Sequence, residues 1–225
     1  MNRCGGIAAR VVFALAAGGG LGQESELLLA KDGAAQAAIV VPDAATPVER
    51  TAAEELRLHL DQATGARFAV TNESAAPAGA KILVGRTAAL SALMPGFDPK
   101  ALGDDGIILK TAGGNLFLSG HPQRGPLYAA DTFLEDEVGV RWWTSTETYV
   151  PRRPTLTVSA LDLRYTPALR FRESYYLDGF DARFKVRLKG NVSSRTRYML
   201  SPMEMIPEAY GGNHRHIFFK PISGS

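Results

Sequence analysis

The stretch Arg124–Pro151, RGPLYAADTFLEDEVGVRWWTSTETYVP, contains both ends of a helix and the beginning of the strand that comes after it. Pro126 suits the first helical turn, where its missing N–H removes no hydrogen bond. Helical spacing places four apolar residues on one stripe: Leu127, Ala130, Leu134 and Val138. Gly139 can adopt the left-handed conformation that ends a helix. We therefore predict a helix over residues 126–138 and a strand over residues 140–143.

A second helix is predicted between Thr46 and Gly65. Thr46 is an N-cap residue, Pro47 suits the first helical position, and Glu49 completes a capping box. Gly65 can end the helix in the left-handed conformation. The predicted buried face of this helix consists of Val48, Ala52, Leu56, Leu60 and Ala63.

Short apolar runs between turn residues predict strands on either side of these helices. The runs are Leu27–Leu29, Ile39–Val41, Phe68–Val70, Lys81–Val84, Ile107–Lys110, Leu116–Ser119 and residues 155–158. Ala112–Asn115 contains two glycines and an asparagine, which tolerate positive φ, and predicts a hairpin turn. Paired strands and two helices with single apolar stripes predict an α+β fold. We expect a mostly antiparallel sheet with both helices packed on it.

The N-terminus has the pattern of an export signal. Arg3 and Arg10 give a positive region, Val11–Ala17 is a short apolar core, and small residues extend from there to Gly22. The core is too short for a permanent membrane span. We predict a signal peptide over residues 1–22 and a secreted or periplasmic protein; a start without a signal is the alternative. Cys4, the single cysteine, would be removed, leaving no disulfide or thiolate metal site.

Charge is distributed unevenly along the chain. Residues 1–163 hold 14 basic and 18 acidic side chains, whereas residues 164–225 hold 11 basic and 5 acidic side chains. The basic residues alternate with Phe, Tyr and Leu instead of forming a block, so we expect no nucleic-acid partner. Arg164–Pro167 is the predicted domain boundary. Beyond it, Leu169–Glu173 alternates like a strand, and Gly179–Lys189 predicts a short basic helix.

Most candidate chemical residues have a structural interpretation. Residues 135–137 are all acidic but point in different directions on a helix, so we expect a solvated face instead of a metal site. Asp104–Gly106 lacks the alternating ligand spacing of a calcium loop and predicts a turn. Trp142 and Trp143 face opposite sides of a strand, so at least one belongs to the core.

Two further sets of residues leave alternatives open. His214 and His216 share one face of an extended segment, but a zinc site needs a third ligand and none is close in sequence. Glu173 comes directly after Arg172, and a salt bridge to a neighbouring arginine is the alternative to a chemical role. The sequence contains no nucleophile elbow, Walker loop or dinucleotide fingerprint. We expect no metal and no cofactor.

The opening stretch resembles a family of large secreted bacterial proteins, domain of unknown function 4838. Their N-terminal domain is similar to that of glycoside hydrolase family 67, the α-glucuronidases. The resemblance extends over residues 36–220. It rests on AAEEL at 52–56, TG at 64–65, ILVGR at 82–86, RYTP at 164–167 and FRE at 171–173. It implies a noncatalytic accessory domain over residues 23–163, and the start of a (β/α)₈ barrel over residues 164–225.

In that resemblance Leu169–Glu173 would be the first barrel strand, with Arg172, Glu173 and Tyr175 pointing toward a sugar pocket. The pattern of Pro167, Leu169, Phe171 and Arg172 also looks like the first strand of family 20. There the arginine binds substrate hydroxyls, although Glu173 stands where that family has glycine. A complete barrel takes about 250 residues, so the catalytic carboxylate pair would be missing from this chain.

These observations leave three hypotheses. The first is a noncatalytic module of a secreted, glycoside-hydrolase-like protein that is inactive alone and contacts carbohydrate through the whole protein. The second is a carbohydrate-binding or scaffold module without hydrolytic activity. The third is a small hydrolase that uses Glu173, His214 and His216. The candidate substrate-binding residues are thus Arg172, Glu173, Tyr175, His214 and His216.

Overall fold

The computed structural model describes residues 26–172, 177–191 and 208–211. The predicted signal peptide lies outside the described residues, and so do Glu173, Tyr175, His214 and His216. The described residues adopt an α+β fold, which confirms the predicted class. None of their helices is long and apolar enough to cross a membrane.

A six-stranded sheet forms the centre of the fold, with the strand order β11-β6-β7-β5-β3-β4. Its strands are β3 (Ala37–Val41), β4 (Val70–Asn72), β5 (Ala80–Val84), β6 (Ile107–Ala112), β7 (Asn115–Gly120) and β11 (Asp162–Tyr165). Three of the five pairings in this sheet are parallel, those that join β4, β3, β5 and β7, so the sheet is mixed and not mostly antiparallel as expected. Across the three sheets of the described residues, five of the eight pairings are antiparallel. No parallel pair of the described strands is joined by a tight turn: α1 lies between β3 and β4, and longer segments separate β3 from β5 and β5 from β7.

The hairpin of β6 and β7 confirms the predicted turn. Gly113 and Gly114 connect the two strands with φ angles of 56° and 73°, the left-handed region that glycine reaches without strain. This hairpin places β6 beside β11, whose four residues are all exposed. The predicted domain boundary between residues 163 and 164 therefore falls inside a strand of the central sheet.

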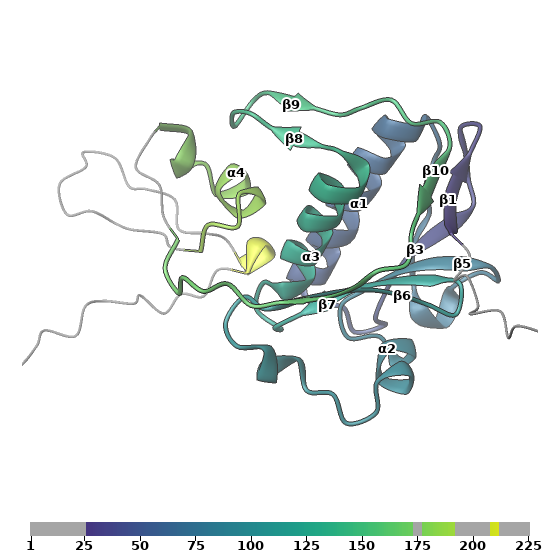
Figure 1. Cartoon of the computed structure of the whole chain (residues 1–225), viewed down its shortest axis with the longest axis horizontal. Helices are drawn as coiled ribbons and strands as arrows, with labels where there is room; N and C mark the ends of the chain where they lie inside the picture. Colours follow the sequence, from purple (N-terminus) through teal and green to yellow (C-terminus); the bar gives the residue numbers. More distant parts are fainter. Residues whose placement is uncertain (1–25, 173–176, 192–207, 212–225) are drawn as a thin grey trace, which may run out of the picture.

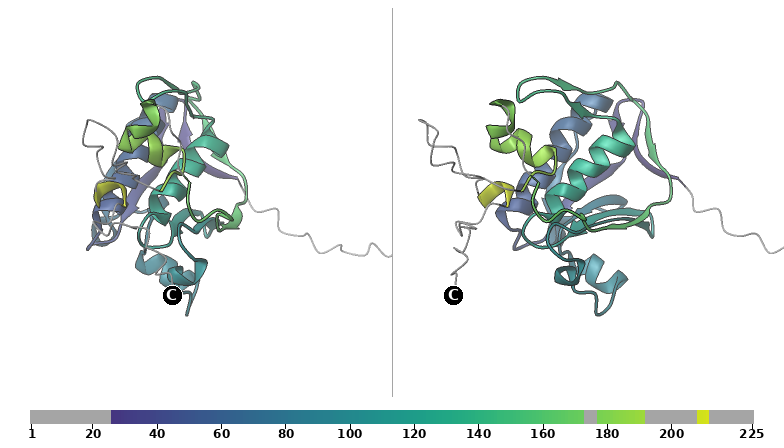
Figure 2. Two further views of the ribbon diagram at one scale, coloured as in Figure 1. Left: turned by 90° about the vertical axis from the view of Figure 1, so that its left-hand side faces the viewer. Right: turned by 60° about the vertical axis from the view of Figure 1, so that its left-hand side comes forward.

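Two helices cover one face of the central sheet, and a short helix lies on the other (Figures 1 and 2). Helices α1 (Pro47–Thr64) and α3 (Gly125–Phe133) pack side by side on the first face, and α2 (Ala88–Leu93) lies on the second. The capping box of α1 is present, with Thr46 N donating to Glu49 Oε2 at 2.8 Å. After α3 the chain continues as one π-helical turn, η3 (Leu134–Val138), which ends at Gly139 in the left-handed conformation.

The main core lies between α1, α3 and the sheet. All five residues of the predicted α1 face are buried there, together with Ile39, Ile82 and Leu118 from alternate positions of the central strands. The intervening residues Val40, Leu83 and Phe117 point to the other face and pack against Leu90 of α2. The strands therefore bury both faces, which fits their continuous apolar sequences.

Two small sheets and several short turns complete the described fold. The first sheet contains β1 (Leu27–Lys31), β2 (Ala34–Ala35) and β10 (Leu156–Val158), and the second pairs β8 (Arg141–Trp142) with β9 (Thr148–Tyr149). The 3₁₀ turns are η1 (Glu73–Ala75), η2 (Pro99–Leu102), η4 (Leu177–Phe180) and η5 (Glu208–Tyr210). Helix α4 (Ala182–Arg187) corresponds to the predicted basic helix and flanks α1 and α3, with its arginines at Glu55 in the middle of α1 (Figures 1 and 2).

Candidate functional site

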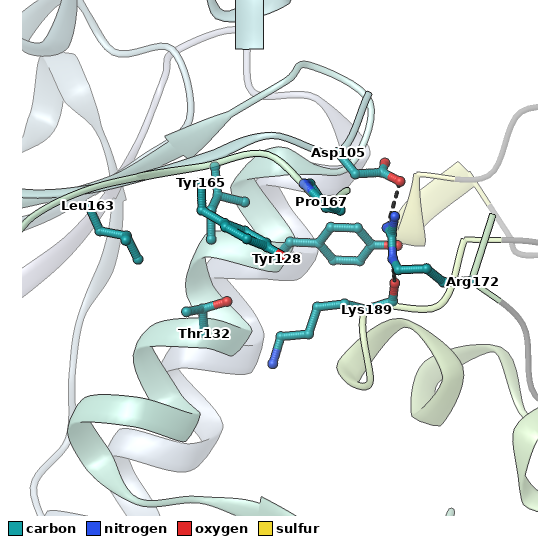
Figure 3. A pocket seen from close by; sticks show the side chains of 9 residues that line it. Asp105, Tyr128, Thr132, Leu163, Tyr165, Pro167, Arg172 and Lys189 are labelled. Carbon is teal, nitrogen blue, oxygen red and sulfur yellow. Dashed lines mark hydrogen bonds and ion pairs between the residues drawn. The ribbon is translucent and has the colours of Figure 1, made fainter. Parts of the chain in front are cut away.

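A pocket of about 340 Å³ opens between α3, the β6–β11 edge of the sheet and the chain beyond residue 166 (Figure 3). Its lining residues are Asp105, Ile107, Tyr128, Thr132, Leu163, Tyr165, Pro167, Arg172 and Lys189. Most of this surface is apolar or aromatic. The floor comes from alternate residues of β11, because Leu163 and Tyr165 share the face on which α3 packs.

Asp105 is the hydrogen-bonding centre at one end of this pocket. It is 1% exposed and has a φ of 63°, and Arg124 Nε donates to its Oδ1 at 2.6 Å. Its Oδ2 accepts from Arg172 Nη2 at 2.8 Å and from Asn191 Nδ2 at 2.7 Å. Burial raises the pKa of Asp105, but the charge of Arg124 and the hydrogen bonds from Arg124, Arg172 and Asn191 outweigh burial and hold the pKa below its usual value.

Arg172 is the one predicted site residue that lies within the described part of the chain. Besides Asp105, its Nε donates to Lys189 O and its Nη1 donates to Leu169 O, both at 2.7 Å. The guanidinium also lies 5.9 Å from the centre of the Tyr128 ring. Three of its five N–H donors therefore hold together chain segments around the pocket. Its predicted role in binding sugar hydroxyls stays a prediction.

Residues 169–172 form no strand, which corrects the predicted barrel strand Leu169–Glu173 over its described part. Asn191 takes the place of a strand neighbour. Its Oδ1 accepts from Arg172 N at 2.9 Å, its Nδ2 donates to Arg170 O at 2.7 Å, and its N donates to Arg172 O at 3.1 Å. A single residue thus satisfies the backbone groups that a ladder would otherwise pair.

A second buried carboxylate, Glu55, joins α1 to α4. Arg183 Nε donates to Glu55 Oε1 at 2.6 Å, and Arg187 Nη2 donates to Oε2 at 2.8 Å. Burial raises the pKa of Glu55, but the two guanidinium groups outweigh burial and lower the pKa below its usual value. This carboxylate is therefore charged and occupied by arginines in the folded protein.

His59 and Trp142 extend the Glu55 cluster toward the β8–β9 hairpin. Trp142 Nε1 donates to His59 Nε2 at 3.2 Å, so the imidazole carries its proton on Nδ1, which lies 2.8 Å from Glu55 O. Burial lowers the pKa of His59, which keeps the ring neutral. The Arg187 guanidinium lies 5.5 Å from the centre of the Trp142 ring. These contacts bury Trp142 and confirm that one tryptophan of the pair belongs to the core.

Asp131 of α3 is completely buried, and neither of its oxygens has a hydrogen-bond partner within the described residues. Burial raises the pKa of Asp131 well above its usual value, and the nearby charge of Glu55 raises it further. Lys189 and Arg187 act in the opposite direction but do not compensate. Asp131 is therefore a buried acid that the fold favours in the neutral form.

Sequence reasoning missed Glu55, Asp131 and the central role of Asp105. The turn predicted at Asp104–Gly106 is present, but its spacing gave no sign that Asp105 points inward. Glu55 and His59 are four residues apart beside the predicted apolar face of α1, and Asp131 lies within the apolar stripe of α3. Polar residues at such positions are the available signal for buried networks. In the described residues no group of three or more potential metal ligands gathers at one site.

Comparison with known proteins locates a similarity in the first half of the chain. Residues 26–133 match the family model described as the N-terminus of glycosyl hydrolase family 67. They therefore form a domain similar to the N-terminal domain of that family, as expected. No curated protein matches the chain.

Among solved structures, the chain is similar to a family GH115 4-O-methyl-alpha-glucuronidase with specificity for decorated arabinogalactans. The TM-score is 0.47 and the sequence identity is 17%. The similarity covers 65% of this chain and 19% of that structure, so the chain spans about a fifth of its length.

Proposed function

We propose that this chain is a noncatalytic N-terminal module of a secreted, carbohydrate-active protein of the glycoside hydrolase type. The observation that carries the proposal is the match of residues 26–133 to the N-terminal domain of glycosyl hydrolase family 67. Catalysis is assigned to residues outside this chain. We also propose that the whole protein has α-glucuronidase-like activity.

The partners of the buried acids support a noncatalytic role. Glycoside hydrolysis uses two carboxyl groups that flank the scissile bond and contact the substrate or its water. Asp105 and Glu55 each bind two arginines, and Asp131 is completely enclosed. These three carboxyl groups are therefore structural, and a catalytic pair would have to come from elsewhere.

Secretion is also part of the proposal. The positive residues Arg3 and Arg10, the apolar core Val11–Ala17 and the small residues up to Gly22 support it. Expression of the whole chain in a bacterium should yield a mature protein in the periplasm or medium. Its intact mass should correspond to cleavage near Gly22. A protein that stays in the cytoplasm at full mass would contradict this part of the proposal.

A second candidate is a carbohydrate-binding or scaffold module whose whole protein never hydrolyses glycosides. The observation that favours it is the exposure of Trp143 and Tyr149, at 60% and 54%, on the β8–β9 hairpin. The two candidates differ in the reading frame beyond residue 225. A barrel with two facing carboxylates favours the first candidate, and a frame that ends without one favours the second.

Glycosidase assays test the noncatalytic assignment directly. The purified chain should release no aryl alcohol from a panel of aryl glycosides that includes aryl α-glucuronides. Turnover that is lost in Glu173→Gln would overturn the proposal and establish the small-hydrolase alternative. Where the reading frame continues beyond residue 225, the longer protein that it encodes serves as the positive control for glycosidase activity.

A further inference from the structure

The β8–β9 hairpin has two distinct faces that result from its register. Arg141 pairs with Tyr149, and Trp142 pairs with Thr148. Trp143 N then donates to Glu147 O at 3.0 Å, which extends the pairing by one step. Because side chains alternate along strands, Trp142 and Thr148 share the inner face, on which Trp142 is buried and Thr148 is partly buried. The opposite face consists of Arg141, Trp143, Glu147 and Tyr149; we call these four residues the outer face of the hairpin.

Two aromatic rings are the main exposed apolar surface of the outer face. Trp143 is 60% exposed and Tyr149 is 54% exposed. They are diagonal neighbours across the two strands, a separation over which aromatic side chains can still form one surface. Single exposed apolar residues are common on proteins, but here two large exposed aromatic residues share one face of a small ribbon.

Contacts on the inner face and at the turn hold this hairpin in place. On the inner face, Trp142 donates to His59 and packs under the Arg187 guanidinium. At the turn, Ser145 Oγ donates to Asp178 Oδ1 at 2.5 Å. The hairpin lies at the periphery of the molecule, on the side opposite α2 (Figure 1). Trp143 is therefore exposed on a backbone that is already held in place, so binding a ligand there loses little conformational entropy.

The size of the outer face argues against a protein partner. A stable protein interface buries about 800 Å² on each partner, whereas one large aromatic side chain contributes about 150–250 Å². The area of two half-exposed rings is closer to that of the flat apolar faces of one or a few pyranose rings than to that of a protein interface. A sugar ring also offers hydroxyl groups at its edge, which need hydrogen-bond partners beside the aromatic surface.

The charges of the outer face narrow the ligand further. Arg141 and Glu147 carry opposite charges and lie on either side of the aromatic pair. Arg141 Nη1 donates to the backbone oxygens of Glu135 and Val140, which fixes the guanidinium and leaves N–H donors on its other nitrogens. A face with one cation and one anion has no net charge to attract a polyanion. It suits vicinal hydroxyls of a neutral sugar.

We propose that the outer face of the β8–β9 hairpin binds neutral polysaccharide, with Trp143 and Tyr149 stacking on pyranose rings. Arg141 and Glu147 hydrogen-bond to the ring hydroxyls. This inference rests on the proposed carbohydrate-active function and gives it a contact surface within this chain. The surface is separate from the pocket at Asp105, whose lining includes none of these four residues.

Affinity electrophoresis tests the inference with the purified chain. Gels contain a neutral β-glucan, xylan or galactan, and a parallel gel contains polygalacturonate as the anionic probe. We expect retardation by a neutral polysaccharide and a dissociation constant that rises about tenfold in Trp143→Ala. Trp143→Phe should keep most of the binding. Phe171→Ala removes another exposed aromatic ring, 54% exposed, and should bind like the wild type.

Each outcome separates the inference from the function on which it rests. Retardation that is unchanged in Trp143→Ala overturns the inference but leaves carbohydrate binding by the chain in place. Stronger retardation by polygalacturonate than by every neutral polymer overturns the choice of ligand. Absence of retardation on all gels overturns the inference, while the aryl glycoside assay still decides the noncatalytic assignment.

Fluorescence gives a second measurement that needs no substitution. The chain has two tryptophans, of which Trp142 is buried and Trp143 is exposed. Acrylamide should therefore quench mainly Trp143, and a bound neutral polysaccharide should protect it. Quenching that is the same with and without a polysaccharide that retards the chain would contradict stacking on Trp143.

Discussion

Glu55, Asp105 and Asp131 show how the partners of a buried carboxyl group decide its state. Glu55 and Asp105 each accept hydrogen bonds from two arginines and have lowered pKa values despite their burial. Asp131 is fully enclosed without such a partner in the described residues, and its pKa is raised. Glu55 and Asp105 are therefore charged and anchor neighbouring segments. Ionisation of Asp131, in contrast, would destabilise the folded protein.

The first prediction concerns Asp131 and pH. Folding raises the pKa of Asp131, so its contribution to stability is complete below the ordinary aspartate pKa of about 3.9. That contribution is lost as the pH rises through the raised pKa of the folded protein. Asp131→Asn keeps the shape without the ionisation. We expect it to unfold at a higher urea concentration than the wild type at pH 8.

The difference between the two proteins should shrink as the pH falls toward 4, where the wild-type carboxyl is also neutral in the folded state. Each unit by which folding raises the pKa corresponds to about 1.4 kcal/mol at pH values above it. Asp136→Asn is the matched control, because Asp136 is an exposed acid one turn later. Equal effects of the two substitutions on the urea midpoint would contradict the prediction.

The second prediction concerns Glu55 and its exposed neighbour Glu54. Glu55→Ala leaves the Arg187 guanidinium buried without its carboxylate. Breaking a buried ion pair in this way costs about 3–5 kcal/mol in the free energy of unfolding. Glu54→Ala removes only a surface contact with Arg57 and should cost about 0.5 kcal/mol or less. Urea unfolding monitored by circular dichroism measures both, and similar costs would show that Glu55 is not an anchor.

At the scale of elements, the two long helices formed where their local signals predicted, whereas the short helix α2 was not predicted. The capping box at Thr46 and the left-handed Gly65 fix both ends of α1. The helical segment that begins with α3 ends at Gly139 as predicted. Its last part, residues 134–138, forms a π-helical turn instead of continuing the α-helix. Within this turn Asp136 is exposed, while Glu135 binds Lys189. The predicted solvated acidic face is therefore confirmed for Asp136 only, because Glu135 and Glu137 are partly buried.

The third prediction concerns the attachment of residues 169–172. Asp105→Asn removes the charge that binds Arg172, and asparagine still tolerates the positive φ of this position. We expect trypsin to cleave after Arg170 and Arg172 about tenfold faster, since weaker attachment raises the population of the open segment. Electrophoresis and mass spectrometry of the fragments give the rates.

Asp104→Asn is the control for this experiment. Asp104 Oδ2 lies 3.4 Å from Arg170 Nε, and both side chains are exposed. Because exposed ion pairs contribute little to stability, this substitution should leave the cleavage rate nearly unchanged. Equal rates in Asp105→Asn and the wild type would show that Asp105 does not hold the segment.

At the scale of the whole molecule, the uneven charge along the sequence has a structural explanation. The acidic excess before residue 164 and the basic excess after it meet in the folded protein. Arg172 binds Asp105, Arg183 and Arg187 bind Glu55, and Lys189 binds Glu135. Four described basic residues beyond position 166 are thus paired with acidic residues of the preceding part of the chain.

The fourth prediction concerns a shortened chain that ends at residue 166. It lacks the arginines of Glu55 and the Arg172 that binds Asp105, and it loses Phe184 and Val186 from the main core. We expect its free energy of unfolding to fall by about 3 kcal/mol or more. Glu55→Leu in the shortened chain should recover part of this loss, because it removes an unpaired buried charge. An unchanged urea midpoint would instead show that the shortened chain is stable without residues 167–225.

The sequence by itself determined the elements whose signals are local: the two long helices, most strands, the β6–β7 hairpin and one buried tryptophan. Capping and alternation act within a few residues and can be read directly. The tertiary structure alone decided which acids are buried and that Trp143, beside the buried Trp142, faces solvent. Glu55 meets Arg187 across 132 residues, and Trp142 meets His59 across 83. Such partners are brought together by packing of the whole chain, and no local pattern specifies them.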